Sequence, residues 1–600
     1  MDVERQPAEV WLARVKDLER KHELLRAFDV ARRGVAQHPD ALWLKHRGVL
    51  CLLRLGAARS ARTLFRAYEL EGRPEEDIAV LPARIAKEEA MEASPRDRVK
   101  LAREAAVLYE AVFRSSHGTY YSGINAATMR LLACEVDEAR ALASEVLRLL
   151  HPANPKSDPY YLPATRAEAL LLLGDRVGAA TAISEAAGAS VDLAARVATY
   201  RQLKAICAEL GEKDRALLAP ISPPAVIHYT GHMISPSDCA GRFPAATEHE
   251  VAERIAQALE EFGVGSGYGA LACGADILFA EAIIARGAEL HVVLPFAQSD
   301  FENHSVAPGG AGWLTRFHAC LRRASSVTYA SSEPYLGGDA IYAFASGFAM
   351  GLAILQARSL DAAVAQIAVS DGSNQAGIAG TARDRETWRA AGLPSHEIPV
   401  ARLAEGLPLP SAEKPEPVQD ARQPRAMLFG DIEGFSKLAE TQIPLFTRVV
   451  MGTIAQNLDR FGAHVLYRNT WGDGISLVFD SAQQAAACAV ALQDELRGLD
   501  LESHALPRTI GLRLGGHYGL VYEITDPVTK RRAFTGSQVS RTARIEPITP
   551  KGEVYVTDVF AAHLALKASD EFKCDYVGHL PAAKDWGEMP MYLVRRLGAR

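Results

Sequence analysis

The sequence predicts a multidomain protein made of an all-α helical-repeat solenoid, an α/β domain with a parallel sheet, and an α+β domain. Three observations predict this arrangement. The 600 residues are far more than one hydrophobic core can serve, which suggests three or four domains. The residue pattern changes near position 220 and again near position 425. The composition, 48% hydrophobic and 23% charged, is typical of soluble globular domains.

The first domain, residues 1–217, is helical by pattern and contains three similar phrases. They are LLRLGAARSA (52–61), RLLACEVDEA (130–139) and LLLLGDRVGA (170–179). In each phrase a small residue follows an apolar run, and an alanine follows five positions later (Ala61, Ala139 and Ala179). Such residues let antiparallel helices approach closely, as in stacked helical hairpins.

This spacing resembles the tetratricopeptide repeat and predicts an α-solenoid. Two interpretations of its surface stay open. The concave side binds a protein or peptide partner, or the helices pack against the other domains of the same chain.

The second domain, residues 222–400, begins after the prolines at positions 220, 223 and 224, which end the helical pattern. Strands are predicted at 225–234, 289–296, 325–331 and 362–372, and helices lie between them. The segment 263–276, GVGSGYGALACGAD, is predicted as a glycine-rich loop that opens a helix. Alternation of strands and helices favours a Rossmann-like parallel sheet covered by helices on both faces.

Ligands of such domains bind at the carboxyl ends of the strands, and free N–H groups at a helix start favour an anion. The candidate ligand loop residues of the middle domain are therefore Gly231, Gly269, Gly274 and Asp276. The alternative is that the glycines serve only tight strand-to-helix turns.

The phrases TGH, GALACGAD and VVLPF, the last followed by an acidic loop, resemble the Rossmann-like SLOG superfamily. The resemblance implies a nucleotide-derived ligand on this domain. Ligand sensing is favoured over catalysis because no nucleophile with a partnered base is visible. A hydrolase or glycosidase that acts on nucleotides stays open as an alternative.

Several bulk features predict a cytoplasmic protein with neither a nucleic-acid nor a membrane partner. The net charge is −7, and the eight cysteines include no CxxC pair. The N-terminus is charged from its second residue, unlike a signal peptide. The apolar segment 340–357 approaches the length of a membrane span, but it is rich in Ala and Gly and has no basic flank. We expect it to be a buried helix.

Residues 401–424 are rich in proline and charge and are predicted as a linker. The third domain, residues 425–600, has short strands separated by two clear helices, as in an α+β sandwich. Asp431 and Asp473 each lie where an apolar strand meets a glycine-bearing turn. Adjacent strands can bring both carboxylates to one sheet edge, where divalent cations and a triphosphate are held by oxygen ligands. Taken alone, each is better explained as an ordinary turn aspartate.

Four ordered motifs make the third domain look like a class III nucleotidyl cyclase catalytic domain, with a ferredoxin-like fold. They are FGDIEGFS, WGDGISLVF, GLRLGGHYGLVYE and TGSQVSRTARIEPITPKGEVYVT. The resemblance implies that a nucleoside triphosphate is converted to a 3′,5′-cyclic nucleotide and pyrophosphate. It implies two divalent metals, Mg²⁺ or Mn²⁺, held by Asp431, Asp473 and the backbone carbonyl of Ile432. Arg544 stands at the position of the arginine that stabilises the transition state.

The resemblance also implies a homodimer through this domain, because the metal aspartates and the arginine of one site come from different subunits. Regulation would come from the N-terminal domains. A catalytically silent sensor or scaffold that only binds nucleotide is the alternative, and the presence of both aspartates and Arg544 favours the enzyme.

Three positions depart from the family pattern, and a fourth is a further candidate site residue. Ser540 replaces the asparagine that orients the ribose, and Asn469 and Ala533 replace the lysine and aspartate that read a purine. Lys584 is a candidate phosphate-binding lysine, although an exposed structural lysine is the alternative. ATP is the default substrate, and GTP or a pyrimidine triphosphate stays open.

Overall fold

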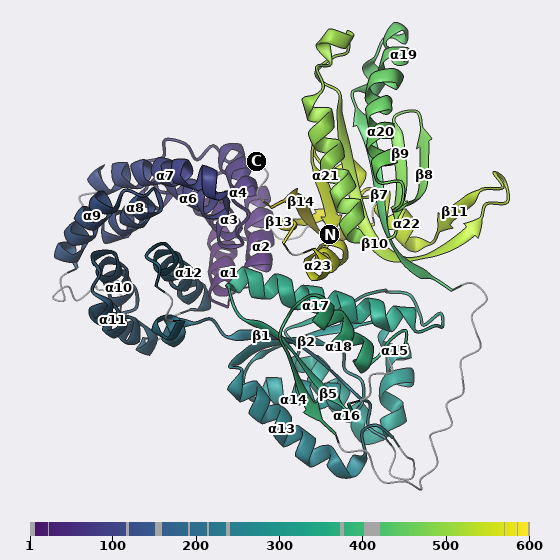
Figure 1. Cartoon of the computed structure of the whole chain (residues 1–600), viewed down its shortest axis with the longest axis horizontal. Helices are drawn as coiled ribbons and strands as arrows, with labels where there is room; N and C mark the ends of the chain where they lie inside the picture. The colour runs from purple at the N-terminus through teal and green to yellow at the C-terminus, as the bar shows by residue number, and fades with distance from the viewer. Residues whose placement is uncertain are drawn as a thin grey trace.

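The computed structural model describes most of the chain and divides it into three regions. It describes residues 6–21, 23–115, 119–150, 159–189, 192–212, 215–235, 241–372, 377–400, 421–568, 570–584 and 586–597. In Figure 1 the N-terminal helices form a crescent, the middle α/β domain lies below, and the C-terminal α+β domain stands above it. The predicted fold class is confirmed in all three regions.

The crescent is a series of helical hairpins. Its helices are α1 (Ala8–Arg20), α2 (Leu24–Gln37), α3 (Leu42–Arg54), α4 (Ala58–Ala67), α5 (Glu76–Ala79), α6 (Leu81–Glu92), α7 (Pro95–Ser115), α8 (Tyr120–Leu132), α9 (Val136–Leu149), α10 (Tyr161–Leu173), α11 (Arg176–Gly188) and α12 (Leu193–Glu209). The small residues after α3, α8 and α10 have left-handed backbone, with φ of 73° at Gly56, 62° at Cys134 and 85° at Gly174. The alanines expected to pack in the following helices are buried. The repeated phrases therefore mark the hairpin turns, as predicted.

The middle domain is a parallel sheet with helices on both faces. Its elements are β1 (Ala225–Gly231), α13 (Glu248–Glu261), β2 (Val264–Gly269), α14 (Ala275–Ala285), β3 (Glu289–Leu294), α15 (Gln298–Phe301), α16 (Ala311–Arg323), β4 (Ser326–Tyr329), α17 (Ala340–Leu360), β5 (Val364–Ser370), α18 (Thr381–Ala390) and β6 (Ser395–Pro399). The strand order is β4-β3-β2-β1-β5-β6, and every paired strand is parallel. The order reverses between β1 and β5, which is where such sheets bind ligands.

The prediction of a glycine-rich loop from residue 263 was wrong for its first half, because 264–269 is the buried strand β2. The glycines of this strand make room for neighbours. A Cβ atom on Gly265, Gly267 or Gly269 would lie 2.4 Å from the side chain of Pro224, Ile283 or Tyr229 respectively. Close packing on both faces, rather than a turn, accounts for these glycines.

The C-terminal domain is a mixed sheet. Its elements are β7 (Gln423–Glu433), α19 (Ile443–Phe446), α20 (Gly452–Arg460), β8 (Val465–Trp471), β9 (Gly474–Phe479), α21 (Ala482–Gly498), β10 (Gly511–Thr525), β11 (Arg532–Thr535), α22 (Ser537–Thr542), β12 (Val554–Thr557), α23 (Asp558–Lys567), β13 (Phe572–Pro581) and β14 (Glu588–Arg596). The strand order is β13-β14-β12-β10-β7-β9-β8, and β11 pairs with β10. Residues 401–420 of the predicted linker lie outside the described residues, and β7 begins within its last two positions.

Residues alternate between the two faces of β7, as expected for a strand in a covered sheet. Leu428 and Ile432 join the core shared with α20 and α21, whereas Met427 packs with Val478 and Val521 on the other face. The short helix α22 covers that second face, where the hydroxyl of Thr542 approaches the sulfur of Met427.

Helix α17 joins the middle and C-terminal domains. A Cβ atom on Gly351 would lie 2.1 Å from the carbonyl oxygen of Ala562 in α23, so the two helices touch along their backbones. The ring of His563 stacks on Phe344 with centroids 5.1 Å apart. Among the described residues, α17 is the helix whose length and composition would suffice to cross a membrane, and 61% of its most apolar window is buried within the protein.

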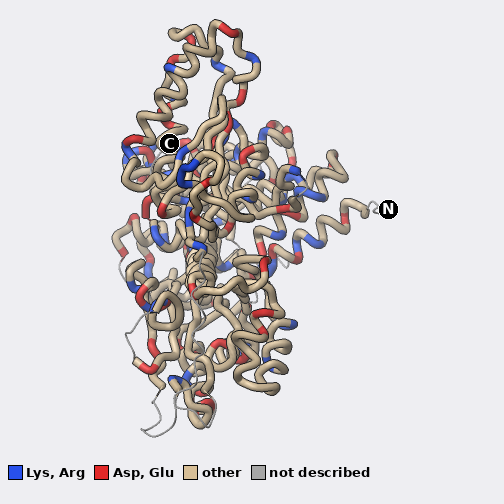
Figure 2. Tube along the Cα trace, turned by 90° about the vertical axis from the view of Figure 1, so that its right-hand side faces the viewer, with Lys and Arg blue, Asp and Glu red and all other residues tan. Residues whose placement is uncertain are grey.

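The crescent contacts the far edge of the C-terminal sheet through polar groups. Buried Asp29 of α2 accepts hydrogen bonds from the hydroxyl of Tyr576 (2.6 Å) and the backbone N–H of His579 (2.9 Å). Glu92 of α6 forms ion pairs with Lys573 and Arg595. Acidic and basic residues are interspersed along all three domains (Figure 2).

Candidate active site

The structure brings Asp431 and Asp473 to one edge of the C-terminal sheet. Asp431 lies near the end of β7, and Asp473 follows Gly472 (φ 73°) in the tight turn between β8 and β9. β7 and β9 are hydrogen-bonded neighbours, with Gly430 opposite Ile475. Burial raises the pKa of Asp473, and the adjacent Asp431 carboxylate raises it further. The turn aspartates are therefore one cluster, as the strand pattern predicted.

Two charged residues that sequence reasoning missed complete this cluster. Arg513 lies opposite Asp431 in the antiparallel register of β10 and β7. Its Nη2 donates to Asp431 Oδ2 (2.6 Å) and lies 2.8 Å from Oε1 of Glu546. Burial raises the pKa of Glu546, and the Arg513 guanidinium opposes that change. The signal in the sequence was a single arginine within the otherwise apolar and glycine-rich GLRLGG.

Glycines of β10 let the following segment lie close to the sheet. A Cβ atom on Gly515 would lie 2.6 Å from the backbone nitrogen of Glu546. The buried ring of His517 has Nε2 2.7 Å from Oε1 of Gln538 on α22 and Nδ1 2.8 Å from Oγ1 of Thr557, the N-cap of α23. Burial lowers the pKa of His517 to about 3, so the ring is neutral. The His517 ring on β10 therefore contacts both α22, through Gln538, and the start of α23, through Thr557.

The other predicted catalytic residues lie on α22 or in the segments that follow it. Arg544 follows α22, and its guanidinium lies 6.0 Å from the ring centroid of Trp586. Its backbone carbonyl accepts a hydrogen bond from Ala583 (3.3 Å), which places exposed Lys584 beside it. Ser540 is exposed on α22. Within the described part of this single chain, Arg544 and Lys584 form no hydrogen bond or ion pair with either aspartate.

The two predicted base-reading positions lie on two strands, β8 and β11, that are not hydrogen-bonded to each other. Asn469 is exposed on β8, and Ala533 is half-buried on β11, opposite Ile524 of β10. The rings of Tyr467 and Phe534, whose centroids are 6.2 Å apart, join these strands. Arg468, which precedes Asn469, is paired with Asp459 of α20 (2.6 Å).

Asp431 and Asp473 offer a donor set of the kind that hard divalent cations take. The apolar side chain of Ile432 is buried in the core. Only its backbone carbonyl can therefore serve as a metal ligand. Within the described residues, no group of three or more His, Cys, Asp or Glu side chains is arranged for metal binding. Two carboxylates fit Mg²⁺ or Mn²⁺, because these ions are commonly held by one or two carboxylates plus water and substrate phosphates.

The middle domain contains a separate cavity of about 860 Å³ at the carboxyl ends of its strands. Gly231 and Asp276 line it, and burial raises the pKa of Asp276 to about 7. His232 and Asp384 also line it; the former lies 3.2 Å from Asp371, and the latter accepts a hydrogen bond from Thr230 (2.8 Å).

The other two predicted loop glycines serve close packing. Gly274 has φ of 107°, and a Cβ atom there would lie 2.4 Å from the backbone nitrogen of Ile234. Gly269 ends β2 beneath Tyr229, and neither glycine lines the cavity. Of the four predicted ligand-loop residues, Gly231 and Asp276 therefore line the cavity, whereas Gly269 and Gly274 serve packing beside it.

This sheet, with its paired carboxylates and its motif order, defines the C-terminal region as a class III nucleotidyl cyclase catalytic domain. Residues 418–596 match the family model of the adenylate and guanylate cyclase catalytic domain, a phosphorus–oxygen lyase. Residues 16–130 match the family model named Tetratricopeptide Repeats-Sensor. The chain therefore joins tetratricopeptide-sensor repeats, a parallel six-stranded sheet and a class III cyclase domain.

Solved structures similar to the chain include adenylyl and guanylyl cyclases. The adenylyl cyclase CyaB from P. aeruginosa is 17% identical over 30% of this chain and 96% of that chain, with a TM-score of 0.26. The guanylyl cyclase Cya2 is 21% identical over 30% and 95%, with a TM-score of 0.26. The guanylate cyclase domain of RhGC from Catenaria anguillulae, in complex with GTP, is 18% identical over 30% and 100%, with a TM-score of 0.25. No curated protein matches the chain.

Proposed function

We propose that this protein converts a nucleoside triphosphate to a 3′,5′-cyclic nucleotide and pyrophosphate, under the control of its N-terminal domains. The observation that carries this proposal is the juxtaposition of Asp431 and Asp473, which is close enough for one carboxylate to raise the pKa of the other. Two like charges held together at a sheet edge need a cation or a proton between them. In a cyclase domain that need is met by the metal ions of the reaction.

Asp431, Asp473 and the backbone carbonyl of Ile432 would hold two divalent cations, Mg²⁺ or Mn²⁺. When bound, such ions lower the pKa of the ribose 3′-hydroxyl and neutralise the triphosphate. Arg513 adds a fixed positive charge beside Asp431. Its planar guanidinium, released from Asp431 by a metal, is suited to bind phosphate oxygens.

Arg544 and Lys584 would act on the triphosphate from the opposite subunit of a homodimer. They lie together near Trp586, and Nε of Arg544 is buried without a hydrogen-bond partner among the described residues. A site shared between subunits requires a guanidinium that is not paired with the carboxylates of its own subunit, and Arg544 meets this requirement within the described residues. Ser540 on α22 would orient the ribose through its hydroxyl.

The default substrate is ATP, and the base-reading positions make GTP, CTP and UTP direct competitors. Asn469 offers both a donor and an acceptor on the exposed strand β8, and Ala533 offers neither. The base would therefore be read with fewer charged contacts than a lysine and an aspartate provide.

Helix α17 supports regulation by the middle domain. Tyr342, Ser346 and Ala349 of α17 line the middle-domain cavity, while Gly351 on the same helix touches α23 of the cyclase. We propose that the cavity binds a nucleotide-derived ligand and that the ligand shifts α17. Such a ligand regulates the enzyme only if it binds active and inactive arrangements unequally.

Product identification tests the proposed function. The full-length protein is incubated with Mn²⁺ and each of ATP, GTP, CTP and UTP, alongside Asp431→Ala and the exposed control Asp459→Ala. We expect one cyclic product from the wild type and from Asp459→Ala, and a loss of at least a hundredfold in Asp431→Ala. If nucleotide binds to the wild type but no cyclic product forms, the silent sensor is the correct function. An altered linear nucleotide profile that disappears in Asp276→Ala would instead identify the middle domain as a hydrolase.

A further inference from the structure

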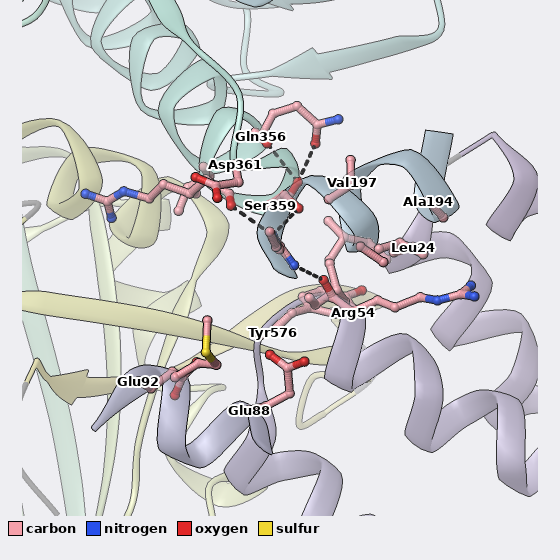
Figure 3. Close-up of a pocket in the computed structure, with 18 of the residues that line it drawn as sticks. Leu24, Arg54, Glu88, Glu92, Ala194, Val197, Gln356, Ser359, Asp361 and Tyr576 are labelled. Carbon is pink, nitrogen blue, oxygen red and sulfur yellow. Dashed lines mark hydrogen bonds between the residues drawn. The ribbon is translucent and has the colours of Figure 1, made fainter. Parts of the chain in front are cut away.

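A large cavity lies where all three domains meet. Its volume is about 940 Å³, within the range of small-molecule sites. Figure 3 shows Leu24 and Arg54 from the crescent, Gln356 and Asp361 from the end of α17, and Tyr576 from the cyclase strand β13 around it. This cavity is separate from the cyclase carboxylates and from the middle-domain cavity described above.

Its apolar part comes mainly from the inner side of the crescent. Leu24, Met91, Met129 and Leu132 line it from the repeats, and Leu355 lines it from α17. Methionine side chains adapt to ligands of different shape, and buried apolar surface contributes most of the free energy of small-molecule binding. The lining therefore suits a ligand with an apolar body.

The polar part of the cavity has an excess of positive charge. Ten of its lining residues are Lys or Arg, and six are Asp or Glu. Several of these cations are already paired within the protein, for example Lys204 with Asp361 (2.7 Å) and Arg54 with Glu19 (3.1 Å). Three further lining cations, Arg84, Lys87 and Arg98, lie on α6 and α7.

Within the described residues, the guanidinium groups of Arg84 and Arg98 form no hydrogen bond or ion pair, and Nε of Arg98 is buried without a partner. Lys87 is held by the amide oxygens of Asn125 (2.8 Å) and Gln202 instead of by a carboxylate. The nearby Glu168 is buried, which raises its pKa to about 7 and weakens its negative charge at neutral pH. Unpaired cations beside an apolar surface are costly unless an anion joins them.

We propose that this three-domain cavity binds a small organic anion with an apolar body, whose phosphate or carboxylate head group is held by Arg84, Lys87 and Arg98. Guanidinium groups suit either head group, because their planar donors match paired oxygens. The ligand would be enclosed by all three domains. Arg201 of α12 already joins the crescent to the middle domain here, because its guanidinium donates to the carbonyls of Arg54 on α3 (3.1 Å) and Ser359 on α17 (2.6 Å).

On the function proposed above, an occupant of this cavity would act as a regulator, because it contacts both the end of α17 and a strand of the cyclase. The binding itself does not depend on that function. A binding measurement therefore fails or succeeds independently of whether the chain makes a cyclic nucleotide.

The test uses the fluorescent anion 8-anilinonaphthalene-1-sulfonate and the full-length protein. We expect saturable binding to the wild type, and at least fivefold weaker binding to Arg84→Gln and Arg98→Gln. Arg148→Gln on the exposed side of α9 serves as the matched control and should bind as the wild type does. Thermal unfolding of each variant shows that the fold is retained.

Competition then identifies the chemistry of the ligand. Octyl phosphate and octanoate, below their micellar concentrations, should displace the probe, and 1-octanol should do so at least tenfold less well. The better of the two anions distinguishes a phosphate from a carboxylate site. Equal displacement by octanol, or equal probe binding by folded wild type, Arg84→Gln and Arg98→Gln, would overturn the proposal.

Discussion

Arg513 and Asp431 occupy facing positions of β10 and β7 and are joined by a 2.6 Å ion pair. Arg513 is thus ion-paired with one of the two carboxylates that would bind metal. On the proposed function, Asp431 would exchange this partner for a cation, and the guanidinium would then be free to bind phosphate. Substitutions at both ends of the pair should therefore reduce catalysis for different reasons.

Replacement of Arg513 should lower kcat/KM on the order of tenfold to a hundredfold, as expected for loss of a charged group that binds phosphate. Arg513→Gln should raise KM for the triphosphate, and Arg513→Lys should restore part of the loss. Arg508→Gln, which removes an exposed ion pair with Glu502, serves as the control. Unchanged steady-state kinetics in Arg513→Gln would show that this arginine has only a structural role.

Acidification should reduce activity at a higher pH than expected for an ordinary carboxyl group. Burial and Asp431 raise the pKa of Asp473, so its protonated form, which cannot bind a cation, persists to higher pH. More Mn²⁺ competes with the proton and should move the acid limb of the kcat/KM profile to lower pH. An acid limb that does not depend on Mn²⁺ concentration would contradict this assignment.

Gly351→Ala should destabilise the protein by about 1–3 kcal/mol, because the added methyl would lie 2.1 Å from the backbone oxygen of Ala562. Gly188→Ala is the matched control, since its added methyl meets nothing within 4 Å. It should be neutral or stabilise by up to about 1 kcal/mol through helix propensity. Thermal unfolding of the full-length variants measures both effects, and similar melting temperatures would refute close α17–α23 packing.

Asp276→Asn should stabilise the protein more at pH 8 than at pH 5. The folded pKa of Asp276 is raised to about 7, so the folded state binds more protons than the unfolded state between roughly pH 4 and 7. Stability is therefore lost as pH rises through that window, and asparagine removes the loss. The difference between the two pH values should be roughly 2–3 kcal/mol. Denaturant unfolding at both pH values checks it, with exposed Asp137→Asn as the control.

Restoring the purine-reading pair should change base selectivity. In Asn469→Lys with Ala533→Asp, we expect kcat/KM for the purine triphosphates to rise at least tenfold relative to CTP and UTP. The measurement compares all four substrates for the double variant, each single variant and the wild type. A uniform change for all four would mean that β8 and β11 do not contact the base.

The local patterns were sufficient for the fold class and for part of the candidate site. The repeated phrases predicted the turns at Gly56, Cys134 and Gly174, and the pattern of strands and turns predicted that Asp431 and Asp473 share an edge. Strand β2 was missed because its glycines look like a loop, and only the packing of Pro224, Ile283 and Tyr229 explains them.

Arg513 and Glu546 were missed for a different reason. Their importance depends on the register of β10 against β7 and on the close approach allowed by Gly515, neither of which a local pattern reports. The three-domain cavity could not be predicted from the sequence either, because the residues that line it are hundreds of positions apart.

The backbone contact between Gly351 and Ala562 also bears on how such a chain can evolve. Sensor domains joined to enzymes by flexible segments are readily exchanged during gene fusion. Here a foreign sensor would need a helix with glycine at the position of Gly351, because any larger residue would push α23 away. Successful natural or engineered hybrids should therefore inherit α17 together with the cyclase rather than with the sensor that it belongs to.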